Sequence, residues 1–416
     1  MNILLISIGT RGDMEPFLAI GQIMKTRGHE VTCLFPEQFQ SLVEDSGFHF
    51  ESLGPEFMEM LESDLGKFAL GGGGSQLKKI LAFIKLARIQ ISNNKNMVRK
   101  QFEAIVKLNP DRVIHNGKAL YPVVWEVENP GKTVYISPVP YLHYVKGHTH
   151  TAFHSNYGEF FNKLTYKLAD WGLLKSIMSL MKWIGVSGIN KKQIKTALND
   201  HTIIYTVSPQ LFKRPAYWPE NMQVLGYHER DKTTNWEPET ALLDFLDKNE
   251  KILFVSFGSM TNPRPEEVTS AFLNILKRHR IPAIINTSSG GLAEPEDYDT
   301  SLFHFVSNIP YDWVFPKVHA VIHHGGSGTT HMGAKNGCAT LIIPHVIDQF
   351  VWNEIIVEKG LGPKGIKIGK ITERKLEPLI VDLMNNAGYK SNAEKLAAQM
   401  RKEDVLEAKL YEALTQ

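Results

Sequence analysis

Cysteine is scarce in this chain, and neither sign of charge is in marked excess. The 416 residues include two cysteines, Cys33 and Cys338, each in or beside an apolar run, and neither pairs with a nearby cysteine or histidine at metal-ligand spacing. Buried free thiols are expected, without cysteine-bound metal, and this usage fits a reducing cytoplasm. Lysine and arginine number 46 against 44 acidic residues and are spread along the chain, so a nucleic-acid-binding surface is not expected.

Long apolar runs are also missing. No segment reaches the roughly 18 consecutive apolar residues of a transmembrane helix, so no membrane span is expected. The first residues, MNILLISIGTRGD, carry no basic segment and no small-residue cleavage site, so they do not read as a signal peptide. A chain of 416 residues is too long for a single hydrophobic core and suggests two domains of roughly 200 residues each.

Short β-branched apolar runs alternate with helical patterns in both halves of the chain. In the first half, strands are expected at residues 2–8, 30–35, 112–115, 133–137 and 203–207, with a helix over 16–27. In the second half, strands are expected at 252–257, 281–286, 302–306, 320–323 and 339–343, with helices at 265–278 and 325–336. This alternation predicts an α/β fold with two Rossmann-like domains that face each other across a cleft.

The domain boundaries follow from composition. Residues 215–238 are rich in proline, tryptophan and charge and look like a connection, so the domains are placed at 1–220 and 221–395, with a C-terminal helix over 396–416 that packs on the outside. Residues 71–75, Gly-Gly-Gly-Gly-Ser, are interpreted as a mobile loop or as an engineered linker. The basic amphipathic stretch Gln76–Phe102 is compatible with weak membrane-surface association or with packing over a ligand cleft or the core. The same ambiguity between cleft and core holds for Leu164–Ile184.

The most informative segment runs from His323 to His331, His-His-Gly-Gly-Ser-Gly-Thr-Thr-His. An expected strand leads into a glycine-rich turn where a helix begins. The first N–H groups of a helix have no internal partner, and the helix dipole adds a partial positive charge, so the turn is a candidate anion site. Gly325, Gly326 and Gly328 allow close approach of the backbone to an anion. Ser327, Thr329 and the His324 ring add donors.

The residues that follow this turn resemble a known family. The turn, then Gly337-Cys338-Ala339, then Asp348-Gln349-Phe350-Val351-Trp352-Asn353, is similar to the donor-site signature of family 1 nucleotide-sugar glycosyltransferases, which have the two-domain GT-B fold. The loop Gly9–Pro16 and the Asp-Gln-Phe-x-Trp ending are most similar to the branch of sterol 3β-glucosyltransferases and glycopeptide-antibiotic glycosyltransferases. The resemblance covers nearly the whole chain and is weakest at about 51–200, where such enzymes recognise the acceptor.

The resemblance implies a UDP-sugar donor, with glucose as the favoured sugar, and roles for individual residues. His324 and the N–H groups of Gly326, Ser327, Gly328 and Thr329 would hold the diphosphate. Asp348 and Gln349 would bind sugar hydroxyls. Gly258 and Ser259 would face the phosphates, Ser289 would lie near the nucleotide, and Ile309 would offer backbone groups to the uracil edge. The family pattern implies inversion at the anomeric carbon, with no metal and no bound cofactor.

Asp13 is the candidate catalytic base, because it follows the first strand, at the carboxyl end of the N-terminal sheet. A carboxylate there can take the proton of an attacking acceptor hydroxyl. The alternative interpretation is that Asp13 caps the helix expected to begin near Pro16. A possible metal triplet, Asp297-Tyr298-Asp299, lies in an acidic polar loop and reads as solvated surface.

The acceptor is the least readable part. Trp125, Tyr141, His143 and Phe153 are candidate acceptor contacts, since aromatic walls suit flat apolar molecules such as sterols, flavonoids or polyketides, and core packing explains them equally well. A lipid-linked glycosyltransferase of the peptidoglycan type is the second functional hypothesis. A dinucleotide-dependent oxidoreductase is disfavoured by the missing Gly-x-Gly-x-x-Gly, and a binding protein without activity is disfavoured by the intact donor motif.

Overall fold

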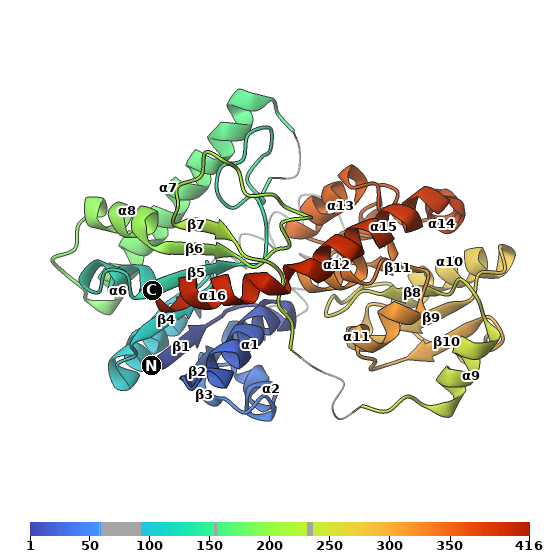
Figure 1. Cartoon of the computed structure of the whole chain (residues 1–416), viewed down its shortest axis with the longest axis horizontal. Coiled ribbons are helices and arrows are strands. Elements are labelled where there is room, and N and C mark those ends of the chain that lie inside the picture. Colours follow the sequence, from blue (N-terminus) through green and yellow to red (C-terminus); the bar gives the residue numbers. More distant parts are fainter. Residues whose placement is uncertain (58, 60–92, 154–155, 231–235) are drawn as a thin grey trace. The chain divides into compact units, whose positions relative to one another are not determined.

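The computed structural model describes residues 1–57, 59, 93–153, 156–230 and 236–416 (Figure 1). The described chain divides into two compact units. Unit 1 contains the described residues from Met1 to Arg230 and also Glu403–Gln416, and unit 2 contains the described residues from Trp236 to Lys402. The expected loop at 71–75 and most of the basic stretch Gln76–Phe102 lie outside the described residues.

Within its described residues, unit 1 contains a parallel sheet of seven strands in the order β3-β2-β1-β4-β5-β6-β7. The strands are β1 (Asn2–Ile6), β2 (Glu30–Phe35), β3 (His49–Ser52), β4 (Arg112–His115), β5 (Thr133–Ser137), β6 (Thr202–Tyr205) and β7 (Met222–Val224). In β1 the four residues after Asn2 are all buried. Such burial on both faces is what selects continuous β-branched and leucine runs in parallel strands. The short strands β3 and β7 were not expected, because they lack such runs.

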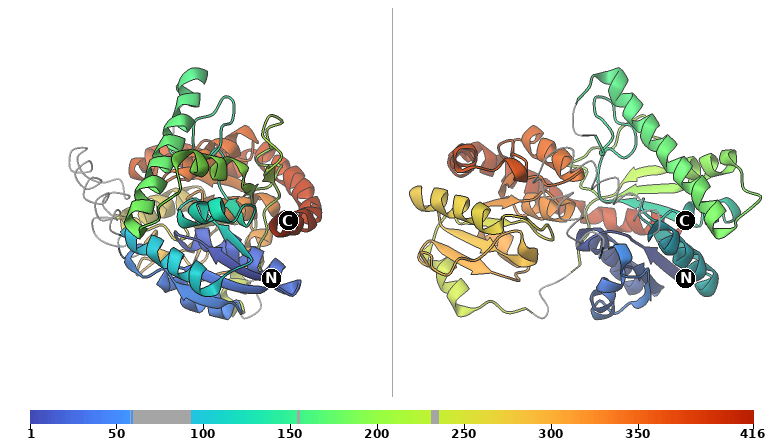
Figure 2. Two further views of the ribbon diagram at one scale, coloured as in Figure 1. Left: turned by 90° about the vertical axis from the view of Figure 1, so that its left-hand side faces the viewer. Right: turned by 180° about the vertical axis from the view of Figure 1, so that it is seen from behind.

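Helices cover both faces of this sheet (Figures 1 and 2). One core contains residues of α1 (Arg11–Thr26), α2 (Gln40–Asp45) and α16 (Leu406–Thr415). The other contains residues of the helical segment 93–108, α6 (Tyr121–Glu128), α7 (Glu159–Ile184) and α8 (Lys191–Asp200). The described part of the basic stretch therefore packs on the core through Met97 and Val98, which are both buried.

Helix α1 begins at Arg11, earlier than the expected start near Pro16. Thr10 is its N-cap, and the Thr10 backbone N–H donates to Asp13 Oδ2 at 2.8 Å. The side chain of Asp13 and the backbone of Thr10 therefore complete the capping arrangement of the first turn. Pro16 lies inside the helix. Capping chemistry, which the position of proline alone does not reveal, decides where this helix starts.

Unit 2 contains, within its described residues, a parallel sheet of five strands in the order β10-β9-β8-β11-β12. The strands are β8 (Leu253–Ser256), β9 (Ala283–Asn286), β10 (Phe303–Val306), β11 (Ala320–His323) and β12 (Ala339–Ile342). Its helices are α9 (Thr240–Lys248), α10 (Pro265–Arg278), α11 (Tyr311–Val314), α12 (Ser327–Lys335), α13 (Asp348–Glu358), α14 (Glu373–Asn385) and α15 (Ala387–Met400). Helix α10 has the expected bounds, because proline begins it, Glu266 and Glu267 follow, and Lys277 and Arg278 end it.

The C-terminal tail differs from the expected single outer helix. It is broken into α15, a 3-10 turn over Arg401–Val405, and α16. Leu410 and Leu414 of α16 are fully buried in a core of unit 1 that also contains Phe17. The end of the chain is thus part of the first unit's interior, a long-range pairing that local periodicity does not encode. Among the described residues, no helix is both long and apolar enough to cross a membrane.

Candidate functional site

Each sheet reverses its strand order at one point, and in each unit a candidate residue follows one of the strands that meet there. In unit 1 the reversal falls between β1 and β4, which pair in parallel, and in unit 2 between β8 and β11. The connections from these neighbouring strands leave in opposite directions, so the loops at their carboxyl ends leave space for a ligand. Asp13 follows β1, and His324 follows β11.

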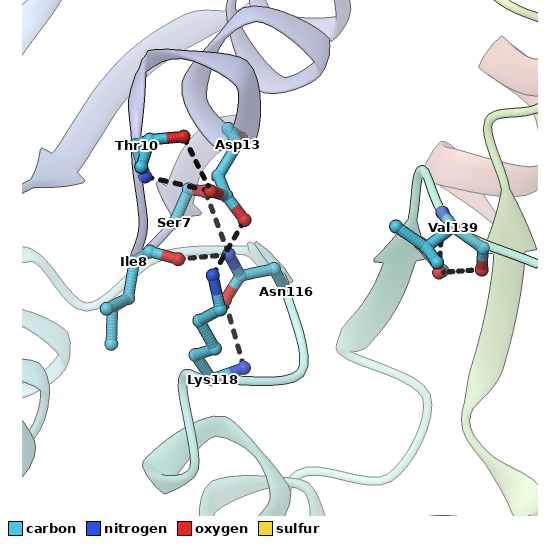
Figure 3. Close-up of polar contacts among 8 residues, drawn as sticks. Ser7, Ile8, Thr10, Asp13, Asn116, Lys118 and Val139 are labelled. Carbon is cyan, nitrogen blue, oxygen red and sulfur yellow. Dashed lines mark hydrogen bonds and ion pairs between the residues drawn. The ribbon is translucent and has the colours of Figure 1, made fainter. Parts of the chain in front are cut away.

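The Asp13 carboxylate is held on two sides (Figure 3). Its Oδ2 accepts hydrogen bonds from the Thr10 N–H at 2.8 Å and from the Thr10 hydroxyl at 3.3 Å. Its Oδ1 lies 2.9 Å from Lys118 Nζ, with 27% of the Asp13 side chain and 52% of the Lys118 side chain exposed. The carboxylate is therefore oriented by its own helix turn, while the partner of Oδ1 is a solvent-exposed lysine.

Asn116 joins the loop after β4 to the loop after β1. Its Nδ2 donates to Ser7 Oγ at 3.0 Å and to the Ile8 carbonyl at 2.9 Å, and its Oδ1 accepts from the Lys118 N–H at 3.1 Å. Ser7 Oγ in turn donates to the Asp13 carbonyl at 2.9 Å. Sequence reasoning missed Ser7, Asn116 and Lys118. The available signal was that polar residues directly follow the buried strand β4, next to β1.

Gly9 is required by the position of Asp13. Its φ is +147°, and a Cβ placed on it would lie 2.1 Å from Asp13 Oδ2. Any side chain at position 9 would displace the carboxylate. The Gly-Thr-x-x-Asp spacing thus accounts for the conformation of this loop. Gly9 leaves space for the carboxylate, Thr10 is the N-cap of α1, and Asp13 accepts from the Thr10 N–H.

In unit 2, His324 is the centre of the glycine-rich turn. A Cβ placed on Gly258, after β8, would lie 2.7 Å from His324 Cε1, and one placed on Gly326 would lie 2.4 Å from His324 Nε2. The imidazole therefore lies against two glycines from neighbouring loops. The adjacent His323 is fully buried, and its Nδ1 accepts from the Gly325 N–H at 3.0 Å. A side chain at Gly258 or Gly326 would overlap the His324 ring, so this ring position requires glycine at both places.

Helix α12 begins at this turn without a capping side chain. Gly326 is the N-cap, makes no side-chain cap, and no acidic residue lies in the first turn. The Gly326 carbonyl accepts from the Thr330 N–H at 2.9 Å and from Thr330 Oγ1 at 2.9 Å. Helical geometry leaves the earlier N–H groups, including those of Gly328 and Thr329, without intrahelical partners. The start of α12 therefore offers backbone N–H groups that no capping side chain engages, and its role as an anion site stays a prediction.

Asp348 and Gln349 begin α13, after β12. Gln349 is buried, and its Oε1 accepts from the N–H groups of His345 at 2.7 Å and Val346 at 3.1 Å. This side-chain carbonyl oxygen thus holds the preceding loop, and the same two hydrogen bonds fix the orientation of the amide. Ile347 precedes Asp348 with φ +25°, an unusual conformation for a β-branched residue, and this strain lies at the start of the helix.

The other expected donor residues come from the same edge of the sheet. Ser259 follows β8 and is exposed, and Ser289 follows β9 in a 3-10 turn with φ +61° and is also exposed. Ile309 follows β10 and is buried. Nearby, Tyr311 stacks on Phe315, and its hydroxyl lies 2.7 Å from Ser256 Oγ. This tyrosine therefore connects the segment after β10 to the end of β8. Parallel pairing brings all of these loops to one edge.

The four histidines of this region are held neutral by burial. Loss of solvation lowers the pKa of His323 to about 3 and that of His345 to about 4. Burial also lowers the pKa of His331 to about 4. For His324, burial acts first and the neighbouring His323 and His345 add to it, so its pKa lies well below the ordinary value. A neutral imidazole offers one N–H donor and no charge.

The four expected acceptor residues do not form one wall. Trp125, on α6, packs against a core of unit 1. Tyr141 stacks on His148 at 4.3 Å between ring centroids, and His143 Nδ1 lies 2.6 Å from the Tyr205 hydroxyl. These two belong to an aromatic cluster with Phe212 and Trp218. Phe153 instead lines a cavity against α7.

The Asp297–Asp299 triplet lies in a surface loop. Asp299 accepts from the Ser301 N–H and hydroxyl, and these hydrogen bonds lower the pKa of its carboxyl. Tyr298 donates to Glu294 at 2.9 Å. Among the described residues, no group of three or more histidine, cysteine, aspartate or glutamate side chains is arranged to hold a metal ion.

The two parallel sheets with their covering helices have the two-domain GT-B fold. Residues 3–114 match the sequence model of the glycosyltransferase family 28 N-terminal domain, and residues 302–406 match that of the erythromycin biosynthesis protein CIII-like C-terminal domain. The chain belongs to the glycosyltransferase family that these two domains characterise.

Individual relatives agree with this assignment. A sterol 3-beta-glucosyltransferase of Arabidopsis thaliana is 30% identical over 97% of this chain, and the chain spans 64% of that protein's length. The crystal structure of the glycosyltransferase of kitacinnamycin superposes with a TM-score of 0.71 at 16% identity and covers 99% of both chains. Glycosyltransferase VinC, solved with dTDP, superposes with a TM-score of 0.63 at 16% identity over 99% of this chain and 98% of that one. The structural likenesses establish the fold.

The buried histidines predict a loss of stability in mild acid. Their pKa values are lower in the folded chain than the unfolded value of about 6.5, so the unfolded chain binds more protons between about pH 4 and 6.5. The contribution of these histidines to the free energy of unfolding is therefore fully present above pH 6.5. It decreases as the pH falls, by about 2 kcal/mol at pH 5 for each histidine whose pKa is about 4. Urea unfolding at pH 7 and pH 5 measures this decrease.

The His331→Gln variant provides the control for this prediction. It removes one of the titrating rings, so its unfolding free energy should decrease less steeply between pH 7 and pH 5 than that of the natural chain. Equal urea midpoints at the two pH values in the natural chain would show that the folded histidines are not held neutral.

Proposed function

We propose that this chain transfers glucose from UDP-glucose to a hydroxyl group of an apolar small molecule, of which a sterol is the first candidate. The transfer inverts the anomeric carbon and needs no metal. The observation that carries the proposal is the uncapped N-terminus of α12, beside the neutral, glycine-packed His324, in a chain of a glycosyltransferase family. The name of the Arabidopsis relative supports both the sterol and the glucose.

Helix α12 would hold the donor diphosphate. The N–H groups of its first turn supply hydrogen bonds, and the helix dipole supplies a partial positive charge that no acidic residue of that turn cancels. His324 adds one hydrogen-bond donor. Gly258 permits this ring position, and Ser259 on the same loop adds a hydroxyl. Because the helix end stabilises negative charge by itself, a divalent cation is not required for the diphosphate to leave.

Asp348 and Gln349 would recognise the sugar. A carboxylate accepts from hydroxyl groups and an amide N–H₂ donates to them, so the pair can bind neighbouring hydroxyls of a hexose. The Gln349 carbonyl oxygen is already engaged by His345 and Val346, which orients the amide. Ser289 and the backbone at Ile309 would contact the nucleotide. These contacts favour a hexose with free hydroxyl groups.

Asp13 would act as the general base. The acceptor oxygen attacks the anomeric carbon while its proton passes to the Asp13 carboxylate, and the bond between that carbon and the diphosphate oxygen breaks with its electron pair leaving on UDP. Thr10 fixes one carboxylate oxygen, so the other, Oδ1, is the proton acceptor. Lys118 must yield this oxygen to the incoming hydroxyl, which its exposed side chain permits.

The direct experiment incubates the purified chain with UDP-glucose and a panel of sterols, flavonoids and macrolides in excess EDTA, with mass spectrometry of the products. Glycosides of one of these acceptors are expected at the same rate with and without the chelator. Products on an undecaprenyl-linked acceptor alone would favour the peptidoglycan-type alternative instead. Dependence of the rate on added metal would contradict the role given to α12.

Substituting Asp13 by asparagine tests the base. The amide keeps the size and the acceptor oxygen needed near Thr10 but cannot take a proton at neutral pH. Turnover is expected to fall about 10²–10⁴-fold while UDP binding is unchanged. Steady-state kinetics and calorimetric titration with UDP measure the two effects. Turnover at the rate of the natural chain would refute the assignment and leave Asp13 as a helix cap only.

Substituting Gly326 by alanine tests the donor turn. The new Cβ would lie 2.4 Å from His324 Nε2, so the ring or the start of α12 must shift. UDP should bind at least about tenfold more weakly, which corresponds to about 1.4 kcal/mol. The matched control is Gly172→Ala, where no heavy atom lies within 4 Å of the added Cβ. Equal UDP affinity in both variants would exclude this turn as the diphosphate site.

A further inference from the structure

The proton acceptor of the proposed reaction, Asp13 Oδ1, is paired with a lysine in this structure (Figure 3). Lys118 Nζ lies 2.9 Å from this oxygen. A carboxylate oxygen can accept a further hydrogen bond, so an acceptor hydroxyl can approach Asp13 beside the ammonium. Once the proton has passed to Oδ1, however, the carboxyl group is neutral and its attraction to the ammonium is lost. The ion pair therefore opposes the proton transfer that the proposed reaction requires.

The backbone of Lys118 is fixed beside the Asp13 loop. Its N–H donates to Asn116 Oδ1 at 3.1 Å, and Asn116 Nδ2 donates to Ser7 Oγ at 3.0 Å and to the Ile8 carbonyl at 2.9 Å. Asn116 is buried. These hydrogen bonds tie the loop after β4 to the loop after β1, so the fold itself places the lysine next to Asp13. The lysine side chain is 52% exposed and can leave Asp13 while the hydrogen bonds of its loop stay intact.

An aromatic ring offers the ammonium a second position. Lys118 Nζ lies 6.0 Å from the centre of the Phe57 ring, and Phe57 packs partly buried against a core of unit 1. The face of an aromatic ring attracts a cation within about 6 Å of its centre. The ammonium can therefore move toward Phe57 when Asp13 receives a proton, without leaving the neighbourhood of the site.

A second acidic residue of α1 forms ion pairs of a different kind. Glu15 Oε2 lies 3.0 Å from Arg230 Nε, and Glu15 Oε1 lies 3.1 Å from Arg11 Nε. Only 15% of the Arg230 side chain and 17% of the Glu15 side chain are exposed. The pair of Lys118 with Asp13 is more exposed, and exposed ion pairs are weak and sensitive to salt. The lysine is thus more readily exchanged than Arg230.

We propose that the ion pair of Lys118 with Asp13 is an inhibitory contact, in which the ammonium competes with the acceptor hydroxyl for the carboxylate. The inference rests on the proposed function. As the acceptor O–H bond breaks, its proton goes to Asp13 Oδ1, and its electron pair forms the bond to the anomeric carbon while the diphosphate leaves. The ammonium moves toward Phe57 at this step. After the product leaves, Asp13 releases the proton to water and the ion pair forms again.

Removing the ammonium tests the proposal. In the variant Lys118→Met, which has a long side chain without charge, kcat/KM for the acceptor should rise about two- to fivefold, the range expected for an exposed ion pair. KM for UDP-glucose should stay unchanged. Lys118→Arg keeps the charge and should not show the increase. A lysine that only supports its loop would give the opposite result, a lower kcat/KM in Lys118→Met. Steady-state kinetics measures these values.

Salt provides a second measurement. Raising the ionic strength from about 0.01 M to about 1 M shortens the Debye length from about 30 Å to about 3 Å and weakens the ion pair. The kcat/KM of the natural chain should therefore approach that of Lys118→Met. The matched control is Lys107→Met, which removes an exposed ion pair with Glu51, 2.6 Å long, elsewhere in unit 1. This control should keep the rate and the salt dependence of the natural chain.

Urea unfolding separates this inference from the proposed function, because it needs no acceptor. If the pair exists in solution, the effect of combining Asp13→Asn with Lys118→Met on the free energy of unfolding differs from the sum of the single effects. Additive effects would overturn the inhibitory contact alone, and so would a kcat/KM in Lys118→Met that is equal to or lower than that of the natural chain. A chain with a coupled pair that glycosylates no acceptor would overturn the proposed function, and the inhibitory contact with it.

Discussion

The parallel pairing of β1 with β4, and of β8 with β11, is the constraint on which both ligand loops depend. Each pair joins strands whose connections run in opposite directions, so the loops after them diverge and leave polar groups accessible. In unit 1 this places Asp13 beside Lys118, and in unit 2 it places Gly258 against His324. Residues more than 60 positions apart in the chain become neighbours because parallel strands end at the same edge.

The glycine-rich turn joins the uncapped start of α12 to a buried neutral ring. His324 is packed by glycines and held uncharged by burial, while the partial positive charge beside it comes from the backbone of α12. A helix end does not change its charge with pH, whereas a histidine does. The burial that keeps His324 neutral also keeps its neighbours His323, His331 and His345 neutral. The free energy of unfolding therefore decreases in acid, where the unfolded chain binds protons that the folded chain does not.

Asp13 has two roles in the structure that need not compete. One carboxylate oxygen completes the first turn of α1, and the other faces a lysine. A capped helix start is a rigid support, so the capping interpretation and the catalytic interpretation of Asp13 describe two oxygens of one group. Helix α7 shows a similar division, with one face bonded to its unit and the other exposed and apolar. In both places a structural contact fixes the orientation of a group that stays partly exposed.

The sequence by itself determined the α/β class, most strand positions and the glycine-rich turn after β11, because buried parallel strands and glycine-rich turns are local signals. Only the tertiary structure decided that Asn116 and Lys118 join the Asp13 loop, that Trp125 lies in a core apart from Tyr141 and Phe153, and that Leu410 and Leu414 enter the first unit. These contacts join segments far apart in the chain. Their energies come from burial and from hydrogen bonds between loops, and neither leaves a periodic pattern in a single stretch of residues.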